Sequence, residues 1–500
     1  MSQPQHIHQF LENQAIARPE AIALQDWDGS EWSFAKEWDV AKKGAELLRL
    51  AGVQRGDRVL MVTENCAMLC AFIYACSLIG AWAVPVNARQ TGAELDRIIK
   101  HATPRVALFM HEVSPDAKAH GTRLKAREVS GAWGKVQITE LHASDPATDG
   151  NVAVMLFTTG TTGTPKGVML TQENLLFTGK TSAKSRGMTE ADTVYGVLPM
   201  THVFGLASML MAATCVGARI RLEARFSAEK LYTALTSGVT ILPAVPQMHA
   251  LLMQYTLERG SQSIAGGSLR YVSSGAAPLD PVWKRKAEEF YGIPLQNGYG
   301  MTETTAGVSM TKSELGDPDT SVGPPLVGVE VSIDESAAGG GDGVGEVLTR
   351  GPHIMLGYFR NGEETAKVID TNSWMHTGDL GKIDTLGRLH ILGRSKELII
   401  RGGFNIYPPE VEAAFNDHPA VVQSAVIGRR TQTGDEEVLA FIQIPASDAV
   451  TVEELRTFVA ERLSAYKRPS QIILTDALPA APTGKLLKHK LVDVFADRLD

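Results

Sequence analysis

The sequence has 500 residues, of which 44% are hydrophobic and 21% charged, so the chain has the composition of a globular protein and is too long for a single hydrophobic core. A net charge of −8 excludes a general nucleic-acid binder, which would present a basic surface, and leaves polyanionic ligands to be met by local cations. The four cysteines include no C-x-x-C pair, which argues against a zinc knuckle and fits a reducing compartment. The polar N-terminus is no signal peptide, and we expect a cytoplasmic protein.

The first long apolar stretch contains no charged residue from Cys66 to Val86, a length that could cross a bilayer. The segments in and before this stretch favour a different structure. DRVLMVT has the pattern of a buried strand, NCAMLCAFIYACSLIG that of a helix ending at Gly80, and AWAVPV that of a second strand. We therefore predict a buried strand–helix–strand unit and no membrane span.

The same alternation continues to about residue 390, with short apolar segments such as AVMLF, ARIRLEA, VTILPAVP and LRYVSSG. This pattern predicts parallel α/β layers. Glycine-rich residues 339–345 are predicted to form a hairpin tip, and a second hairpin is centred on Thr385–Gly387. The composition changes near Ser395. We predict an α/β fold with a large N-terminal domain of layered subdomains, residues 1–395, and a small mobile α+β domain, residues 396–500.

The segment LFTTGTTGTPKGVML, from Leu156 to Leu170, has the composition of a phosphate-binding loop. It is not a Walker loop, because Pro165 precedes Lys166 and Gly167 follows it where Ser or Thr is required. Five threonines and two glycines still offer hydroxyl and backbone N–H donors, and Lys166 adds a charge. Taken alone, the segment could equally be a flexible surface loop.

Three further segments carry candidate functional residues. In QNGYGMTETT, Tyr299 could stack on a purine, Thr302 could donate to a phosphate and Glu303 could bind Mg²⁺, although a turn followed by a capped helix would have the same pattern. Asp379, in WMHTGDLG, could accept both hydroxyls of a ribose or could be a turn residue. Lys485, in PTGK, could be catalytic or simply solvated.

Five motifs in one order decide between these alternatives: TTGTTGTPKG, YGMTE, HTGDLG, GRSKELIIRGGFNIYPPEVE and PTGK. Together they resemble the core motifs of the adenylate-forming superfamily, and in particular the acyl-CoA synthetases related to 4-coumarate–CoA ligase. The resemblance runs from about Phe157 to Lys485. Phe157 and Thr159 stand where Tyr and Ser are more usual in the first motif, which leaves its glycines, hydroxyls and lysine intact.

The resemblance implies an ATP-dependent acyl-CoA synthetase, an AMP-forming acid–thiol ligase that uses ATP, Mg²⁺ and CoA. Such an enzyme converts a small carboxylic acid to acyl-AMP with release of pyrophosphate, and then transfers the acyl group to CoA with release of AMP. An acyl-AMP ligase that loads a carrier-protein pantetheine is the alternative. A non-catalytic nucleotide binder is disfavoured because both Lys485 and Glu303 are present. A monomer and a homodimer both remain open.

The resemblance also assigns the nucleotide and CoA sites. Glu303 would hold Mg²⁺, and Lys485 would bridge the acid and the α-phosphate in the first half-reaction. Lys396 would be the hinge on which the small domain rotates. The remaining assignments are Thr158, Thr159, Gly160, Thr161, Thr162, Gly163 and Lys166 for the β- and γ-phosphates; Gly275, Ala276 and Ala277 along the adenine and acyl pocket; Asn297, Gly298 and Tyr299 for adenine; Thr302 for the α-phosphate; Asp379 and Arg394 for the ribose; and Gly402 and Gly403 for the pantetheine tunnel.

The acyl pocket is expected in LPMTHVFGLAS, where His202 would be a catalytic gate beside the carboxylate and Val203 and Phe204 would line the pocket. No acidic residue lies between Tyr195 and Arg219, so the ammonium of an amino acid would be unpaired. THVFGLASML, AVPQMHALLM and TETTAGVSM contain no Arg or Lys, which disfavours a dicarboxylate unless a cation comes from elsewhere. The prediction is an apolar monocarboxylic acid: aryl, hydroxycinnamate or medium-chain fatty acid.

Overall fold

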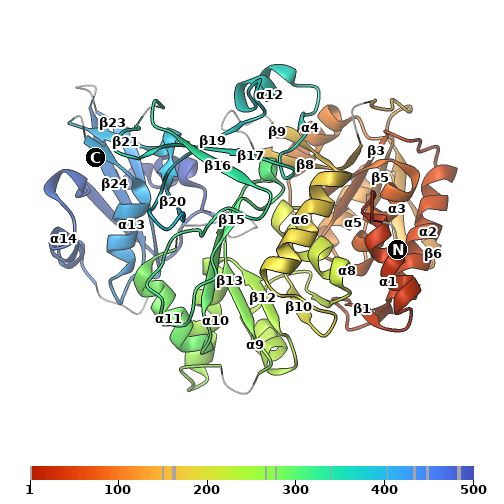
Figure 1. The fold of residues 1–500 in the computed structure, drawn as a ribbon, viewed down its shortest axis with the longest axis horizontal. Helices are drawn as coiled ribbons and strands as arrows, with labels where there is room; N and C mark the ends of the chain where they lie inside the picture. Colours follow the sequence, from red (N-terminus) through yellow and green to blue (C-terminus); the bar gives the residue numbers. More distant parts are fainter. Residues whose placement is uncertain are drawn as a thin grey trace.

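The computed structural model describes residues 3–148, 151–159, 165–264, 267–275, 279–337, 339–402, 404–431, 435–445, 450–480 and 486–499. In Figure 1 the first three hundred residues form layered sheets and helices on the right and at the bottom, and the last hundred form a smaller unit on the left. Residues 330–394 lie between them at the top. The architecture is mixed α/β, as the sequence predicts.

The first sheet is assembled from segments far apart in the sequence. Its strands are, in spatial order, β18 (Gly357–Tyr358), β9 (Pro165–Thr171), β8 (Val152–Thr159), β4 (Trp82–Asn87), β3 (Arg58–Thr63), β5 (Val106–Phe109), β7 (Gly134–Glu140) and β6 (Arg127–Gly131). The central pairs β3–β4, β3–β5 and β4–β8 are parallel, as expected. β8 and β9 instead form an antiparallel hairpin, because the connection of residues 160–164 is too short for a crossover. The candidate phosphate-binding segment therefore begins and ends in two antiparallel strands.

The second sheet has a parallel centre with antiparallel edges. Its strands are, in spatial order, β15 (Ser309–Met310), β14 (Leu295–Tyr299), β13 (Tyr271–Ser274), β12 (Ile241–Ala244), β10 (Thr193–Gly196), β11 (Arg219–Leu222), β1 (Ile22–Gln25) and β2 (Glu31–Ser33). β14 and β13 end on the same side of this sheet, so Tyr299 and Gly275 lie at one edge. Ligands of parallel α/β sheets bind at such an edge.

The apolar stretch near residue 70 is a buried strand–helix–strand unit, as predicted. β3 leads into α3 (Ala67–Ile79), whose residues from Ala67 to Ser77 are buried, and β4 follows. Gly80 ends the helix with a φ of 70°, a left-handed conformation that glycine adopts without strain. Across the described ranges, no helix combines the length and hydropathy that a membrane crossing would require.

The helices of the N-terminal part begin mostly at side-chain caps. Thr171 ends β9 and caps α6, where its hydroxyl accepts from the Asn174 N–H at 3.1 Å and the Asn174 side chain accepts from the Thr171 N–H at 2.8 Å. Besides α3, the helices of this part are α1 (His8–Ala17), α2 (Phe34–Leu50), α4 (Gly92–Ala102), α5 (Pro115–Arg123), α6 (Gln172–Ser185), α7 (Val203–Gly205), a π-helix (Leu206–Met211), α8 (Ala212–Val216), α9 (Ala228–Thr236), α10 (Pro246–Glu258), α11 (Pro281–Tyr291) and α12 (Gly362–Val368).

Both predicted hairpins are present in an antiparallel sheet. This sheet contains β16 (Glu330–Asp334), β17 (Gly345–Arg350), β19 (Met375–Ile383) and β20 (Leu389–Arg394). The glycine-rich residues connect β16 to β17, and a turn over Asp384–Arg388 connects β19 to β20. The same sheet places Asp379 directly across from Arg394.

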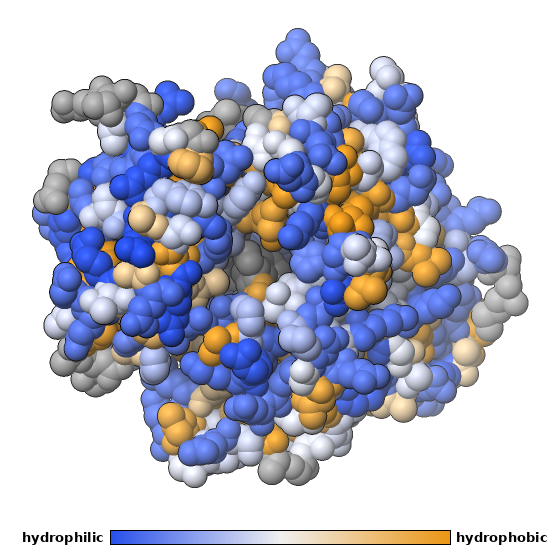
Figure 2. All heavy atoms as spheres, turned by 60° about the vertical axis from the view of Figure 1, so that its left-hand side comes forward, coloured by the Kyte–Doolittle hydropathy of each residue, from blue (hydrophilic) through white to orange (hydrophobic). Residues whose placement is uncertain are grey.

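The last hundred residues have a core of their own. It contains buried residues from Ile399 to Ile472, packed around β21 (Ile399–Arg401), β22 (Phe404–Ile406), β23 (Gln423–Arg430), β24 (Glu436–Gln443), β25 (Gln471–Thr475), α13 (Pro408–Asn416) and α14 (Val452–Ala460), with α15 (Leu491–Val494) at the end. A 3₁₀ turn, Ser395–Glu397, connects this core to β20. We propose the domain boundary at this turn. In Figure 2 a hollow lies near the middle of the face where the small domain comes forward, and hydrophobic side chains gather along one side of it.

Candidate active site

Three candidate nucleotide residues from different motifs meet at one point. Asp379 on β19 is almost fully buried, and the Arg394 Nε lies 3.2 Å from its Oδ1. The Tyr299 hydroxyl, at the end of β14, donates to the Asp379 Oδ2 at 2.5 Å. Burial and the Asp379 charge raise the pKa of Tyr299 well above its usual value, so the phenol stays a donor, and the same carboxylate raises the pKa of Arg394. An anionic carboxylate fixed by a cation and a phenol can accept from vicinal hydroxyls.

A second cluster joins the candidate metal ligand to the lysine of the phosphate loop. Glu303 lies in the 3₁₀ turn Thr302–Thr304, and its Oε1 accepts from the Tyr358 hydroxyl at 2.9 Å. Tyr358 is on β18, which pairs with β9, and the Lys166 ammonium lies 4.9 Å from the centre of its ring. Thr158 is the cross-strand neighbour of Lys166. Tyr358 therefore contacts both functional groups.

Lys166 also has an anionic partner. Its Nζ lies 2.5 Å from the Glu364 Oε2 at the start of α12, and the other oxygen of Glu364 pairs with Lys367 at 2.5 Å. These two lysines lower the pKa of Glu364 to about 2. Sequence analysis missed both Tyr358 and Glu364, because the two-residue strand that brings Tyr358 to β9 has no detectable periodicity.

The residues around Glu303 fit Mg²⁺. Within the described ranges no group of three His, Cys, Asp or Glu side chains is arranged as a complete metal site. Mg²⁺ does not need such a group, since it is usually held by one or two carboxylates, substrate phosphates and water. Glu303 is buried, and the Tyr358 hydrogen bond on Oε1 leaves Oε2 for a cation.

The predicted adenine residues lie beside this cluster. The Asn297 side chain is buried, donates through Nδ2 to the Ser321 carbonyl at 3.1 Å and accepts from the Gly298 N–H at 2.9 Å. The Thr302 side chain is also buried. Contacts of Asn297, Gly298 and Thr302 with a nucleotide stay predictions.

Phe204 and Gly275 lie against each other in the region predicted to bind the acid. A Cβ at position 275 would stand 3.0 Å from the Phe204 ring, so glycine is what allows the ring to approach β13. Phe204 is half-buried in α7, which continues as the π-helix Leu206–Met211. His202 is the N-terminal cap of α7, and Val203 is part of the buried core. Roles for His202 and Val203 in the reaction stay predictions.

Comparison with known proteins agrees with this geometry. The family model of AMP-binding enzymes matches residues 11–359, and that of the AMP-binding enzyme C-terminal domain matches residues 410–485. The chain belongs to the AMP-binding enzymes. A 2-succinylbenzoate–CoA ligase of Geobacillus kaustophilus is 32% identical over 486 residues, 96% of each chain. An oxalate–CoA ligase of Arabidopsis thaliana is 31% identical over 509 residues, 98% of each chain.

Solved structures of similar proteins cover nearly the whole AMP-binding enzyme. ATP-bound MatB from Rhodopseudomonas palustris aligns with a TM-score of 0.85 at 28% identity, over 99% of this chain and 100% of that one. An o-succinylbenzoate CoA synthetase from Bacillus subtilis, solved with its acyl-adenylate intermediate, aligns with a TM-score of 0.81 at 29% identity, over 96% and 97% of the two chains. The chain is thus an AMP-forming CoA ligase, and its cofactors are ATP, Mg²⁺ and CoA.

Several predicted residues of this AMP-binding enzyme can be placed only in part. Lys396 lies in the 3₁₀ turn at the proposed boundary, and Gly402, with a φ of 58°, donates its N–H to the Asp435 Oδ1 at 2.9 Å. Other predictions lie outside the described residues, namely the side chain of Thr159 together with Gly160, Thr161, Thr162, Gly163, Ala276, Ala277, Gly403 and Lys485.

An open cavity of about 190 Å³ adjoins the predicted acyl gate of the AMP-binding enzyme. Thr201, the residue before His202, is part of its lining. Glu64 lies in the same wall and accepts from two guanidinium groups, that of Arg225 at 2.8 Å and that of Arg89 at 2.9 Å. The Arg225 guanidinium also pairs with Asp116 at 2.9 Å, so two carboxylates balance the two guanidinium charges. Sequence analysis did not predict this cluster, whose members come from three separate strand ends.

Proposed function

We propose that this CoA ligase activates a carboxylic acid with an apolar body, either an aryl, hydroxycinnamyl or medium-chain group, and transfers it to CoA within one composite site. The packing of Phe204 against Gly275 supports an acyl pocket at the edge of the second sheet, because the glycine brings an aromatic wall next to β13. Tyr299 at the end of β14 in the same sheet donates to Asp379 on β19, which with Arg394 would hold the ribose of ATP.

The proposed roles in the first half-reaction follow from charge. Lys166 would neutralise the leaving pyrophosphate, and Glu303 would hold Mg²⁺, which supplies charge neutralisation between the phosphates when bound. Lys485 would bridge the acid and the α-phosphate, where negative charge moves as the acyl–phosphate bond forms. Rotation about Lys396 would then withdraw Lys485 and bring Gly402 and Gly403 to the pantetheine arm.

The substrate of this ligase has either one carboxylate or two. The sequence argument for a monocarboxylate depends on three segments without Arg or Lys. The reported relatives are named for 2-succinylbenzoate and oxalate, and each of these acids carries two carboxylates. A substrate with an apolar body can be a monocarboxylate or a dicarboxylate, but a dicarboxylate needs a cation to bind its second carboxylate.

A panel of acids scored by pyrophosphate release, with and without CoA, tests the proposed function. Benzoate-, cinnamate- and octanoate-type acids are incubated with ATP and Mg²⁺, and AMP and thioester are quantified by mass spectrometry. We expect acid-dependent pyrophosphate release in both series and thioester only with CoA. A thioester that forms on a carrier protein and not on free CoA would identify the alternative acceptor, and pyrophosphate release from no acid would refute the proposal.

A further inference from the structure

Arg186 is a buried cation without an anionic partner among the residues that the structure describes. It follows α6 as its C-terminal cap and is 3% exposed. Its two terminal nitrogens donate to Ser208, one to the backbone carbonyl and the other to the hydroxyl, while its Nε has no partner in the described part of the chain. Asp192, a nearby residue in the sequence, is paired with Arg270 at 2.6 Å.

A charge in this position is costly unless something balances it. Burial lowers the pKa of Arg186, but a guanidinium keeps its proton under all ordinary conditions. The ring of Tyr271, whose centre lies 5.9 Å from the guanidinium carbon, offers partial compensation. Buried charges in proteins are otherwise paired with an opposite charge, and here the described chain provides none within 4.0 Å.

The surroundings of Arg186 place it at the deep end of the proposed acyl site. Ser208 lies one helical turn beyond Phe204, in the π-helix that continues α7. Tyr271 is on β13, on the same face as Ser273 and Gly275, since alternate residues of a strand share a face. The Ser273 hydroxyl is likewise buried, and it has no hydrogen-bond partner among the described residues.

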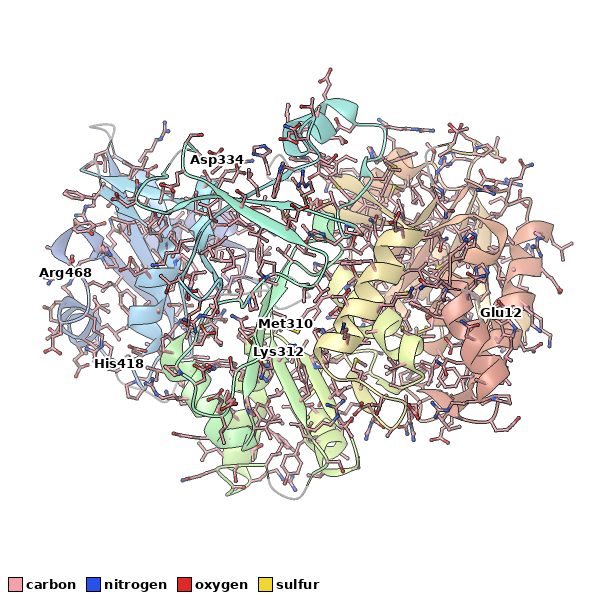
Figure 3. All side chains as sticks on the ribbon, in the orientation of Figure 1. Glu12, Met310, Lys312, Asp334, His418 and Arg468 are labelled. Carbon is pink, nitrogen blue, oxygen red and sulfur yellow. The ribbon has the colours of Figure 1, made fainter. Side chains whose placement is uncertain are left out.

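The second sheet connects this polar cluster to the nucleotide side of the site. The Tyr271 hydroxyl donates to the Met310 sulfur at 3.4 Å, and Met310 on β15 pairs with Gly298 on β14. Figure 3 shows Met310 near the centre of the molecule. Tyr271 therefore links Arg186 to the edge of the second sheet where the predicted nucleotide residues lie.

We propose that Arg186 is a specificity-determining residue that binds a second carboxylate at the distal end of the substrate, so that the preferred substrate is a dicarboxylic acid with an apolar body. A guanidinium has five N–H donors, of which Ser208 takes only two, and its planar form suits a carboxylate. The Ser273 hydroxyl can donate to the same carboxylate. This inference depends on the proposed function, since it concerns the acid that the ligase activates.

Matched acids on the unaltered enzyme provide the first test. Straight-chain monoacids from butanoate to octanoate are each compared with the diacid of the same length, and kcat/KM is measured by pyrophosphate release. We expect at least one diacid to exceed its monoacid by about a hundredfold, as for sites built to bind a polar group. Monoacids activated with all diacids rejected would overturn the role of Arg186 and leave the proposed function intact. Failure of every acid would overturn both.

Variants separate substrate binding from a structural role. In Arg186→Gln we expect KM for the preferred diacid to rise about a hundredfold, with the matched monoacid and ATP little affected. Arg186→Lys should retain part of the preference, because it keeps the charge. Ser208→Ala removes one partner of Arg186 but leaves the guanidinium, and should keep the preference. If Arg186→Gln lowers kcat/KM equally for the monoacid and the diacid, Arg186 only stabilises the π-helix, and the proposal is overturned.

Discussion

Tyr358 contacts both the proposed metal ligand and the proposed phosphate-binding lysine. Its hydroxyl donates to Glu303, and the Lys166 ammonium lies over its ring. In Tyr358→Phe the ring remains, but the Glu303 Oε1 is left buried without its donor. Because groups that orient a metal ligand typically change metal affinity by about tenfold or more, we expect the half-saturating Mg²⁺ concentration to rise about tenfold. The measurement is the Mg²⁺ dependence of pyrophosphate release.

Tyr74→Phe is the matched control for this prediction. Tyr74 is on α3, away from the site, and its buried hydroxyl donates to the Thr214 hydroxyl on α8 at 2.9 Å. If Tyr358→Phe and Tyr74→Phe have the same Mg²⁺ dependence as the unaltered enzyme, the hydroxyl of Tyr358 does not position Glu303 for the metal.

Glu364 pairs with Lys166 and would compete for it with the phosphates of ATP, which Lys166 is proposed to bind. The pair is 2.5 Å apart and about a quarter exposed on each side, so its strength is modest and depends on salt. We expect Glu364→Gln to lower KM for ATP by about two- to threefold at low ionic strength, with a smaller effect at high salt. Glu363→Gln, an exposed neighbour, is the control. A higher KM for ATP in Glu364→Gln would mean that Glu364 holds Lys166 in its working position.

At the scale of elements, α7 and β13 would form the wall of the proposed acyl site, where Phe204 lies against Gly275. Phe204→Ala enlarges this region. We expect kcat/KM for small or planar acids to fall and bulkier acids to gain relative to them, by roughly 1–3 kcal/mol per contact. ATP affinity should hardly change, since no nucleotide contact is assigned to Phe204. An unchanged ranking of benzoate-, cinnamate- and octanoate-type acids would place the acyl site elsewhere.

The 3₁₀ turn Ser395–Glu397 is the element on which the proposed rotation depends. Proline fixes φ near −65°, so Lys396→Pro should obstruct the rotation. We expect nearly normal acyl-AMP formation and slow thioester formation from acyl-AMP and CoA, measured separately. Lys396→Ala, which keeps backbone freedom, should support both steps. A fast second step in Lys396→Pro would move the hinge to another position.

At the scale of the whole molecule, a buried carboxyl group makes stability depend on pH. Glu37 on α2 is 1% exposed, and burial raises its pKa from 4.5 to about 8. Because the folded pKa exceeds the unfolded one, the protonated carboxyl contributes stability that is complete below pH 4.5 and is lost as the pH rises to about 8. Glu37→Gln should therefore stabilise the protein by roughly 3 kcal/mol at pH 7 and hardly at all near pH 4.

Thermal unfolding midpoints across this pH range test the prediction. Glu46→Gln, at an exposed position on the same helix, should shift the midpoint little at any pH. A destabilised Glu37→Gln at neutral pH would show that the ionised carboxylate has a partner in the folded protein.

The sequence by itself determined the family, the layered α/β fold, the buried unit around α3, both hairpins and the residues that meet at Asp379. These conclusions depend on local patterns and on ordered motifs, whose residues have their chemistry wherever the chain places them. Asp379, Arg394 and Tyr299 belong to three separate motifs, and each carried its own signal.

Only the tertiary structure decided which other groups meet them. Tyr358 reaches Glu303 through a two-residue strand, and Arg186 reaches Ser208 and Tyr271 from the end of a helix whose sequence is otherwise ordinary. The β8–β9 hairpin likewise follows from sheet pairing and not from the apolar pattern of β8. The physical reason is that burial and partners depend on contacts between segments distant in the chain. Arg186 therefore becomes a buried cation only when the elements around it pack together.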